Sequence, residues 1–325
     1  MYEENIGQRI EGGYQNVTDA ALFTLWEYQP VSALKIQPGF RYAYNSRFDA
    51  PLISSLALRF EPVENLVIRG SYGQGFRAPS LKELYFLFVD ENHNILGNEN
   101  LKAETSNNYQ LGINFAQAYE YSSISAGLDV FFNDINNEIR LVSVIEPDAD
   151  DPRGLFENRN VAKTQTTGIT FNLSYKYKNL EFKRGFSLVG VRNNLAFSEE
   201  AGENNLDGFN FYPQVQFNIS YSFEELSLIP SLFINHTGTR TDLATNTEGD
   251  FVNVEFESFT MADFTIQKQL FDNKLNLTLG VKNLLDITDI SANQIISGGA
   301  HSSGSSSIPM SYGRNFFVRL QLRLQ

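Results

Sequence analysis

The segment Ser122-Ser-Ile-Ser-Ala-Gly-Leu-Asp-Val-Phe-Phe-Asn133 decides the fold of this chain, because apolar residues occupy alternate positions along it. Successive side chains of a β-strand point to opposite faces of a sheet, so this spacing predicts a strand with one apolar and one polar face. The apolar face carries Ile124, Ala126, Leu128, Val130 and Phe132. The opposite face carries Ser123, Ser125, Gly127, Asp129 and Asn133.

The same alternation returns along most of the chain. It is close to perfect in Val215–Phe223, Leu275–Lys282 and Phe316–Gln325. Looser examples are Thr18–Tyr28, Leu34–Asn45, Leu52–Pro62, Leu66–Phe76, Glu104–Phe115, Phe156–Tyr177, Phe186–Phe197, Leu226–Thr237 and Phe256–Gln269. Together these segments predict an all-β fold with about thirteen strands and little helix.

The composition agrees with strands that could meet a bilayer. The 325 residues include 27 Phe and 15 Tyr, which favour β-structure, while the mean hydropathy is only -0.26. No apolar run approaches the roughly 18 residues of a transmembrane helix. A membrane strand needs only every second residue to be apolar, and its other residues lower the average. If the chain enters a membrane, we expect it to do so as strands.

Charge and residue content exclude several classes of protein. The formal net charge is -13 and no stripe of Lys and Arg is present, which argues against nucleic acid as a partner. The absence of cysteine excludes disulfides, thiolate zinc sites and a cysteine nucleophile. Only three histidines occur, and none stands at motif spacing from a serine and an acid. We therefore predict no catalytic site and no enzyme activity.

The links between the predicted strands alternate between long and short. The long links are Arg77–Ala103, Glu146–Leu155, Ser198–Asn210, Gly238–Glu255 and Leu284–Ser311. The short links are Glu61–Asn65, Ala116–Tyr121, Lys178–Gly185, Glu224–Glu225 and Leu270–Lys274. A soluble β-sandwich would show similar strands, but this rhythm is typical of a transmembrane antiparallel β-barrel with short periplasmic turns and long extracellular loops.

The same rhythm predicts that the barrel is incomplete. About thirteen strands, counted back from a periplasmic last strand, start at the outer rim and leave Tyr2–Asn16 as part of an outer loop. Single-chain bacterial barrels have even strand numbers, so upstream strands are expected to be missing. Met1–Asn5 lacks the basic and apolar regions of a secretory signal.

Five passages resemble, in the right order, sequences of the TonB-dependent outer-membrane receptors for siderophores, haem and cobalamin. They are Gly70–Tyr85, Gly97–Thr105, Phe131–Ile139, Asn158–Lys163 followed by Thr167–Phe171, and Gly280–Asp286. Among them, Phe131–Ile139 resembles the bulged strand of that family. The family motif residues are Phe76, Arg77, Ala78, Pro79, Asn98, Asn100 and Leu101. The resemblance extends from about residue 30 to the C-terminal end.

This resemblance implies that residues 1–325 are the C-terminal portion of a receptor barrel. About thirteen of an expected 22 strands would be in this chain, and the N-terminal strands, the plug domain and the energy-coupling segment would not be present. The chain would be the wall of a receptor for TonB-energised uptake of a metal-chelate nutrient. Family members tend to end on an aromatic residue, whereas this chain ends Leu324-Gln325.

The resemblance also implies a location and partners. The location would be the outer membrane of a Gram-negative-type bacterium. The partners would be outer-membrane lipid and lipopolysaccharide, the metal chelate, and a TonB-type energy-coupling complex reached through the missing N-terminal part.

One predicted loop carries the candidate ligand-binding residues. They are Tyr85, Phe86, Phe88, Asn92 and His93, which would offer apolar area and hydrogen bonds to a chelate. Loop aromatics beside a barrel rim could instead belong to an interfacial girdle. His93 lies between two motif passages, as in haem receptors of this family, although Glu99 stands where those receptors usually have proline. His93 is therefore the candidate axial ligand of haem iron, with haem as transported ligand rather than resident cofactor.

Other residues in the motifs and loops have simpler interpretations beside the functional ones. Gly73 and Gly75 permit a bulge or a close backbone approach, and Arg77 offers a cation at the rim. The acidic run Glu146–Asp151 could bind calcium or remain a solvated loop. His236 and His301 are expected to be solvated.

Two other classes of protein stay open at this point. A passive porin would share the barrel and the loop rhythm without the Phe76–Pro79 passage. A soluble β-rich adhesin or carbohydrate-binding protein would share the strands alone.

Overall fold

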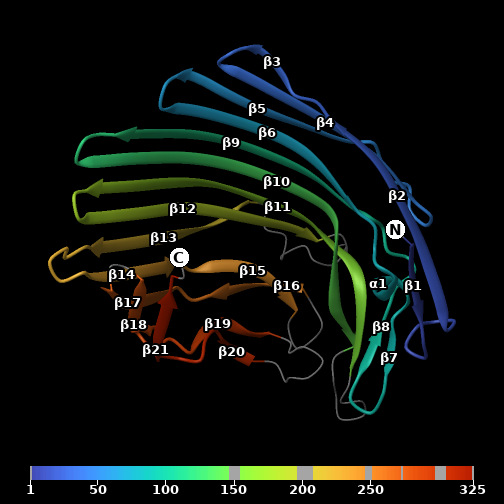
Figure 1. Cartoon of the computed structure of the whole chain (residues 1–325). Helices are drawn as coiled ribbons and strands as arrows, with labels where there is room; N and C mark the ends of the chain where they lie inside the picture. The colour runs from blue at the N-terminus through green and yellow to red at the C-terminus, as the bar shows by residue number, and fades with distance from the viewer. Residues whose placement is uncertain are drawn as a thin grey trace.

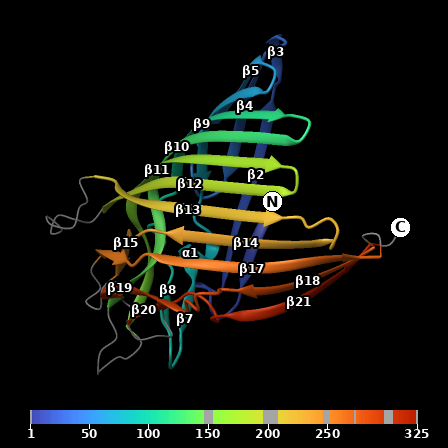
Figure 2. The same ribbon diagram turned by 90° about the vertical axis from the view of Figure 1, so that its left-hand side faces the viewer.

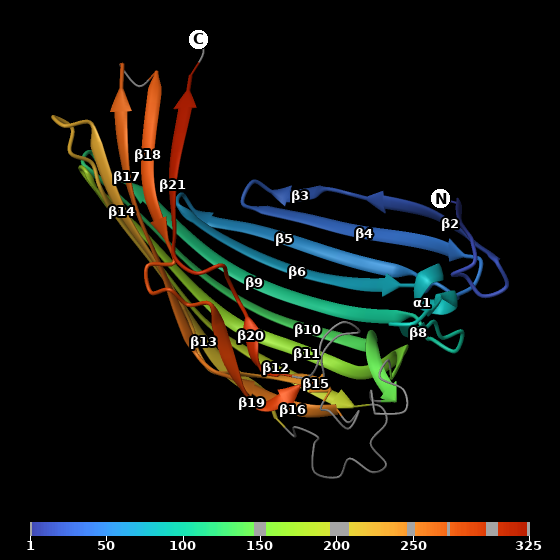
Figure 3. The same ribbon diagram turned by 90° about the horizontal axis from the view of Figure 1, so that it is seen from below.

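Long antiparallel strands form a single curved wall (Figures 1 and 3). The computed structural model describes residues 2–145, 154–195, 208–245, 251–271, 274–296 and 305–323. The wall strands in this part are β2 (Tyr14–Leu25), β4 (Leu34–Asn45), β5 (Ile53–Val63), β6 (Leu66–Arg77), β9 (Glu104–Ala118), β10 (Ser122–Ile145), β11 (Leu155–Tyr177), β12 (Leu180–Leu195), β13 (Asn210–Tyr221), β14 (Leu228–Thr237), β17 (Phe259–Leu270), β18 (Leu275–Lys282) and β21 (Asn315–Leu322). These thirteen strands confirm the predicted all-β architecture.

Each wall strand pairs with the next wall strand along the chain, so the sheet is an up-and-down meander from β2 to β21. Within the described residues, no pairing joins β21 to β2, and the wall is open at both edges. Figure 2 shows the short turns gathered at one end of the wall and the longer connections at the other. The predicted long and short links therefore lie on opposite ends.

The strand register sorts side chains into two faces. One row across six neighbouring strands is Phe60, Ile68, Ile113, Leu128, Phe171 and Phe186. The adjacent row is Arg59, Arg69, Gly112, Asp129, Thr170 and Ser187. We call the side of the first row the apolar face and the side of the second row the polar face. In a transmembrane barrel these are the lipid-facing and lumen-facing sides.

The short turns are tighter than predicted. Asn65 and Lys178 take positive φ values of 77° and 48° at two of them, which lets the chain reverse within a few residues. The predicted turn Lys178–Gly185 is reduced to Lys178 and Asn179, because β12 already begins at Leu180. Because Gly185 has no side chain, it interrupts the alternating pattern, and the sequence did not show that β12 extends back to Leu180.

The long links carry secondary structure of their own. The link after β6 contains α1 (Leu81–Tyr85), β7 (Leu87–Val89) and β8 (Asn94–Leu96). The links predicted as loops at Gly238–Glu255 and Leu284–Ser311 contain β15 (Arg240–Thr245), β16 (Phe251–Phe256), β19 (Asp289–Ile296) and β20 (Ser305–Pro309). These four strands form a separate sheet, and its buried cluster consists of Val254 and Phe256 of β16 and Ile290 and Ala292 of β19.

Three further strand predictions need correction. The expected outer loop Tyr2–Asn16 contains β1 (Tyr2–Ile6), which pairs with the start of β2 as a hairpin. A short strand β3 (Tyr28–Val31) follows β2 and also pairs with β4. Strand β10 was expected to end at Asn133 but runs on to Ile145, because its hairpin with β11 continues past a bulge. The bulge between Ile135 and Ile139 confirms the predicted irregularity of Phe131–Ile139.

Helix is nearly absent from the described residues, which contain only the five-residue α1. Within that part of the chain, no helix is long and apolar enough to cross a membrane.

The two faces give a first prediction. Phe171 is 41% exposed on the apolar face, and the next residue, Asn172, lies on the polar face opposite Gly127 and Gly185. Because a lipid-facing lysine costs about 2–4 kcal/mol near the bilayer midplane, Phe171→Lys should lower the free energy of unfolding by that amount. Asn172→Lys should change it by under ~1 kcal/mol. Urea titration in phospholipid vesicles, read from the fluorescence of Trp26, measures both; equal losses would contradict the assignment of the faces.

Candidate functional site

The connection between β6 and β9 folds back over the loop end of the wall. It contains α1 and the hairpin β7–β8, and β8 runs parallel to the start of β11. The hydrophobic cluster beneath it consists of Ile10, Val17, Leu81, Leu84, Tyr85 and Leu101. This cluster joins residues from β2, α1 and the return to β9, so the connection is a folded lobe. We call it the rim lobe, residues 77–104.

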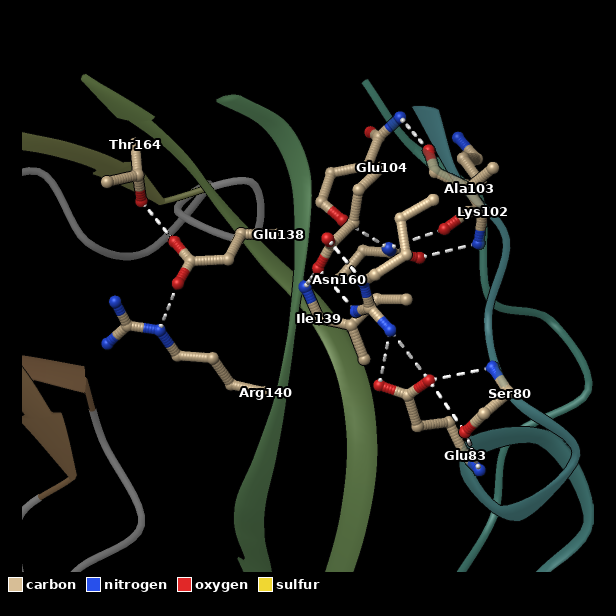
Figure 4. A network of polar contacts seen from close by, with 12 residues as sticks. Ser80, Glu83, Lys102, Ala103, Glu104, Glu138, Ile139, Arg140, Asn160 and Thr164 are labelled. Carbon is tan, nitrogen blue, oxygen red and sulfur yellow. Dashed lines mark hydrogen bonds and ion pairs between the residues drawn. The ribbon is translucent and has the colours of Figure 1, made fainter. Parts of the chain in front are cut away.

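Arg77 fastens the rim lobe to the wall. Its guanidinium donates two hydrogen bonds of 2.6 Å to the carboxylate of Glu104, at the first residue of β9. It also donates to both carboxylate oxygens of Glu83 in α1, at 2.9 and 3.0 Å (Figure 4). One planar cation thus joins the end of β6, the helix and the start of β9, with the fork geometry that suits arginine. The rim cation expected from the sequence is neutralised by two carboxylates.

The helix α1 begins with a capping box. The amide of Glu83 donates to Oγ of Ser80 at 3.2 Å, and the amide of Ser80 donates to Oε2 of Glu83 at 2.7 Å (Figure 4). Burial alone would raise the pKa of Glu83, but the hydrogen bonds from Arg77 and Ser80 outweigh it and hold the pKa below its ordinary value. Glu83 therefore stays ionised at neutral pH and serves both the cap and the arginine.

The second motif passage closes the rim lobe from the other side. The side-chain oxygen of Asn98 accepts a hydrogen bond from the backbone amide of Asn100 at 2.9 Å. The backbone amide of Asn98 donates to the carbonyl of Glu83 at 2.9 Å. Its Nδ2 donates to the carbonyl of Asn158 in β11 at 3.0 Å. Leu101 is 4% exposed and packs in the hydrophobic cluster. These motif residues hold the chain in position and need no ligand to explain them.

A second set of amide contacts ties the lobe to the bulge of β10. Oδ1 of Asn160 accepts a hydrogen bond from the backbone amide of Lys102 at 2.8 Å. Its Nδ2 donates to the backbone carbonyls of Lys102 and Asn137 at 3.0 and 2.7 Å. Asn137 has a φ of 58° and donates to the carbonyl of Ala103 at 3.2 Å. Figure 4 shows Asn160 between Ile139 and the Lys102–Ala103 backbone. The bulge thus brings the backbone of β10 into contact with the rim lobe.

The structure brings four of the five candidate ligand residues together in the β7–β8 hairpin. The rings of Phe88 and His93 are stacked with centroids 4.3 Å apart, and Phe86 lies 5.7 Å from Phe88. Nδ1 of His93 is 2.7 Å from Oδ1 of Asp90, and the amide of Asn92 donates to the same oxygen at 2.9 Å. The side chain of His93 is 12% exposed. The hairpin therefore holds a largely buried imidazole that is oriented by a carboxylate.

Tyr85 occupies a different environment from the other four candidates. It is 8% exposed within the hydrophobic cluster, and burial raises the pKa of its phenol. Arg47 donates a hydrogen bond to its hydroxyl and stacks 4.9 Å from the ring centroid. The ring belongs to the support of the lobe, a placement that the sequence did not indicate because Arg47 is 38 residues away.

The remaining candidates lie elsewhere. His236 in β14 is within 2.9 Å of the hydroxyl of Thr260 on the neighbouring strand. His301 and the acidic run Glu146–Asp151 lie outside the described residues. In the part of the chain that the structure describes, no group of three or more His, Asp, Glu or Cys side chains could hold a metal ion.

The sequence did not single out Glu83 and Glu104, the two partners of Arg77. The Ser80-x-x-Glu83 spacing of a capping box was a usable signal for Glu83. Nothing in the sequence indicates Glu104, because its contact depends on the pairing of β6 with β9.

A meandering wall with one apolar face, and a rim lobe over its loop end, defines the chain as part of a transmembrane β-barrel. The family model described as TonB dependent receptor-like, beta-barrel matches residues 4–284. The chain belongs to this family.

The relatives of the chain are named after different molecules. The chain is 24% identical over 260 residues to the probable hemoglobin and hemoglobin-haptoglobin-binding protein 4 of Haemophilus influenzae, covering 71% of this chain and 24% of that protein. It is 25% identical over 236 residues to the vitamin B12 transporter BtuB of Photobacterium profundum, covering 71% and 33%.

Among solved structures, the ferric enterobactin receptor PfeA of Pseudomonas aeruginosa has the same fold. Its Q482A mutant in complex with enterobactin superposes with a TM-score of 0.68 at 20% identity, covering 95% of this chain and 46% of that one. The chain thus spans less than half the length of these relatives.

The close approach of Gly97 to the backbone of α1 predicts the effect of a small substitution. A Cβ atom on Gly97 would lie 2.5 Å from the backbone carbon and oxygen of Leu84. Gly97→Ala should displace α1 and raise hydrogen exchange at the amides of Leu84 and Phe86 by about tenfold, since overpacking costs about 1–3 kcal/mol. Gly70→Ala, where no atom lies within 4 Å of the added group, is the matched control. Unchanged exchange in Gly97→Ala would refute the close approach.

The ionised Glu83 predicts an acid-sensitive lobe. Its pKa is lowered in the folded state, so its contribution is complete above the unfolded-state value of about 4.3 and is lost as the pH falls through the lowered value. Hydrogen exchange at the amides of α1 should therefore rise selectively below about pH 4, while the amides of β10 in the wall stay protected. In Glu83→Gln the acid-dependent rise should disappear, and a rise that persisted would assign it to another group.

Proposed function

We propose that this chain is the ligand-facing wall of an outer-membrane receptor that takes up a metal-chelate nutrient with TonB-type energy coupling. The observation that carries the proposal is the fastening of the rim lobe by Arg77, Glu83 and Glu104, which holds the aromatic and polar groups of the β7–β8 hairpin at the loop end of the wall. Energy coupling would require the whole receptor, and this chain matches the barrel domain of that family. The apolar face would lie in outer-membrane lipid and lipopolysaccharide.

Haem is the candidate chelate with the most specific support. His93 would be the axial ligand of the iron, and Asp90 lies against its Nδ1; a carboxylate behind a ligating imidazole orients the ring and raises its basicity. Phe86 and Phe88 supply apolar surface beside it. Several relatives are named as haemoglobin-binding proteins, including one 33% identical over 119 residues. An iron siderophore or cobalamin would use the same hairpin without the iron–imidazole bond.

Titration with haemin tests the ligand. We expect a Soret shift on binding to the refolded chain, and a loss of that shift with about tenfold weaker binding in His93→Ala, because an axial ligand bond is removed. His236→Ala, on the wall, should bind as the unchanged protein does. Asp90→Asn should keep the shift but weaken binding, since the imidazole loses its orienting charge.

If His93→Ala binds haemin with an unchanged spectrum, the axial-ligand proposal fails. Transport of a chelate would then be examined with ferric siderophore and cobalamin.

A further inference from the structure

The turn that joins β1 to β2 lies against the rim lobe. It consists of residues 7–13. The backbone amide of Leu87 donates to the carbonyl of Arg9 at 2.9 Å. The backbone amide of Glu11 donates to the carbonyl of Tyr85, also at 2.9 Å. Because both bonds use backbone groups, they fix the position of Arg9 beside the start of β7 and leave its side chain available.

The side chain of Arg9 stacks on the hairpin that carries His93. Its guanidinium carbon lies 4.0 Å from the centroid of the Phe88 ring. The imidazole of His93 is stacked on the same ring, with centroids 4.3 Å apart. The guanidinium carbon and the centre of the imidazole are therefore no further apart than these two distances added together. Phe88 holds a cation and the candidate metal ligand close to each other.

Arg9 differs from Arg47 and Arg77, which also lie at the rim lobe. Arg77 is neutralised by two carboxylates, and Arg47 donates to the hydroxyl of Tyr85 and to the side-chain oxygen of Gln15. Arg9 is exposed, and within the described residues its guanidinium donates no hydrogen bond and forms no ion pair. Its charge and its planar set of N–H donors are therefore available to a ligand.

A tetrapyrrole with carboxylate side arms fits this arrangement. A metal bound by an imidazole lies at the centre of the macrocycle, and the plane of the macrocycle is perpendicular to the metal–nitrogen bond. The plane can therefore extend from His93 past the edge of Phe88 to Arg9, and the side arms leave from its periphery. A guanidinium binds a carboxylate through two parallel N–H···O hydrogen bonds. The side arms of cobalamin end in amides and offer no such partner.

We propose that Arg9 binds a peripheral carboxylate of a tetrapyrrole whose metal is bound by His93. The turn between β1 and β2 thus supplies specificity, and the β7–β8 hairpin supplies the metal ligand. The site selects a macrocycle with carboxylate arms over one whose arms are amides or esters. The inference rests on the proposed haem ligand and assigns a second contact to it.

The test compares haemin with haemin dimethyl ester, which keeps the iron and the macrocycle but carries no free carboxylate. Each is titrated into the refolded chain, and the dissociation constant and the Soret spectrum are measured. Arg9→Gln removes the cation. Arg319→Gln is the matched control, because Arg319 is also exposed and lies in β21, at the opposite edge of the wall.

We expect Arg9→Gln to weaken haemin binding about tenfold and to leave ester binding unchanged, because only haemin has a carboxylate to lose its partner. The Soret shift should keep its position, because the iron ligand is retained. Arg319→Gln should bind both compounds as the unchanged chain does. If Arg9→Gln binds haemin as tightly as the unchanged chain, the role of Arg9 is overturned. An equal loss for haemin and ester would also overturn it, since Arg9 would then only support the hairpin.

Failure of the proposed function gives a different result. The unchanged chain would then bind neither compound with a Soret shift, and the inference would fall with the haem ligand. Each variant is first checked for heat-modifiable mobility. If Arg9→Gln does not fold, Arg9→Lys decides, because it keeps the charge but loses the planar fork. It should weaken the binding of haemin alone, and an equal effect on both compounds would overturn the contact.

Discussion

The interstrand hydrogen-bond ladder is the constraint on which the rest of this structure depends. Each wall strand between the two edges receives its backbone partners from the strands before and after it, so the register of one pair determines the next. A slip of one residue would exchange the two faces, placing Asp129 where Leu128 stands. Because neighbouring strands are antiparallel, every second connection returns to the same end, so the ladder brings the long connections together there.

The fastening of the rim lobe explains why its motif residues have the identities they have. Pro79 cannot extend the ladder, Ser80 and Glu83 start a helix immediately after it, and Arg77 joins that helix to the next wall strand. Ion pairs as exposed as that of Arg77 contribute little singly, but here one cation serves two carboxylates, and Glu104 also accepts the amide of Ile139 at 2.7 Å. The ligand candidates in the β7–β8 hairpin therefore inherit their position from residues that would not touch a ligand.

Alternation lets the same strands serve two environments near the loop end. On one side of β10–β12, Glu138 accepts a hydrogen bond from Thr164, which contacts Asn193 at 3.0 Å (Figure 4 shows the first two). On the other side, the register places Asp134, Gln165 and Arg192 in one row of the apolar face. The two faces of the wall near its loop end are thus built from adjacent positions of one hairpin and its neighbour. A substitution can alter one without touching the other.

The sequence by itself determined the strands, their two faces and the ends at which they turn, because a period of two and the spacing of the links are local properties. It also indicated the bulge of β10 and the family motifs. Only the tertiary structure decided what those residues do. The contact of Arg77 with Glu104 requires the pairing of β6 with β9, and Arg47 reaches Tyr85 across 38 residues. Likewise, the sheet of β15, β16, β19 and β20 forms where two links bury their apolar residues together. These contacts depend on which distant segments the ladder brings side by side, and no local pattern encodes that.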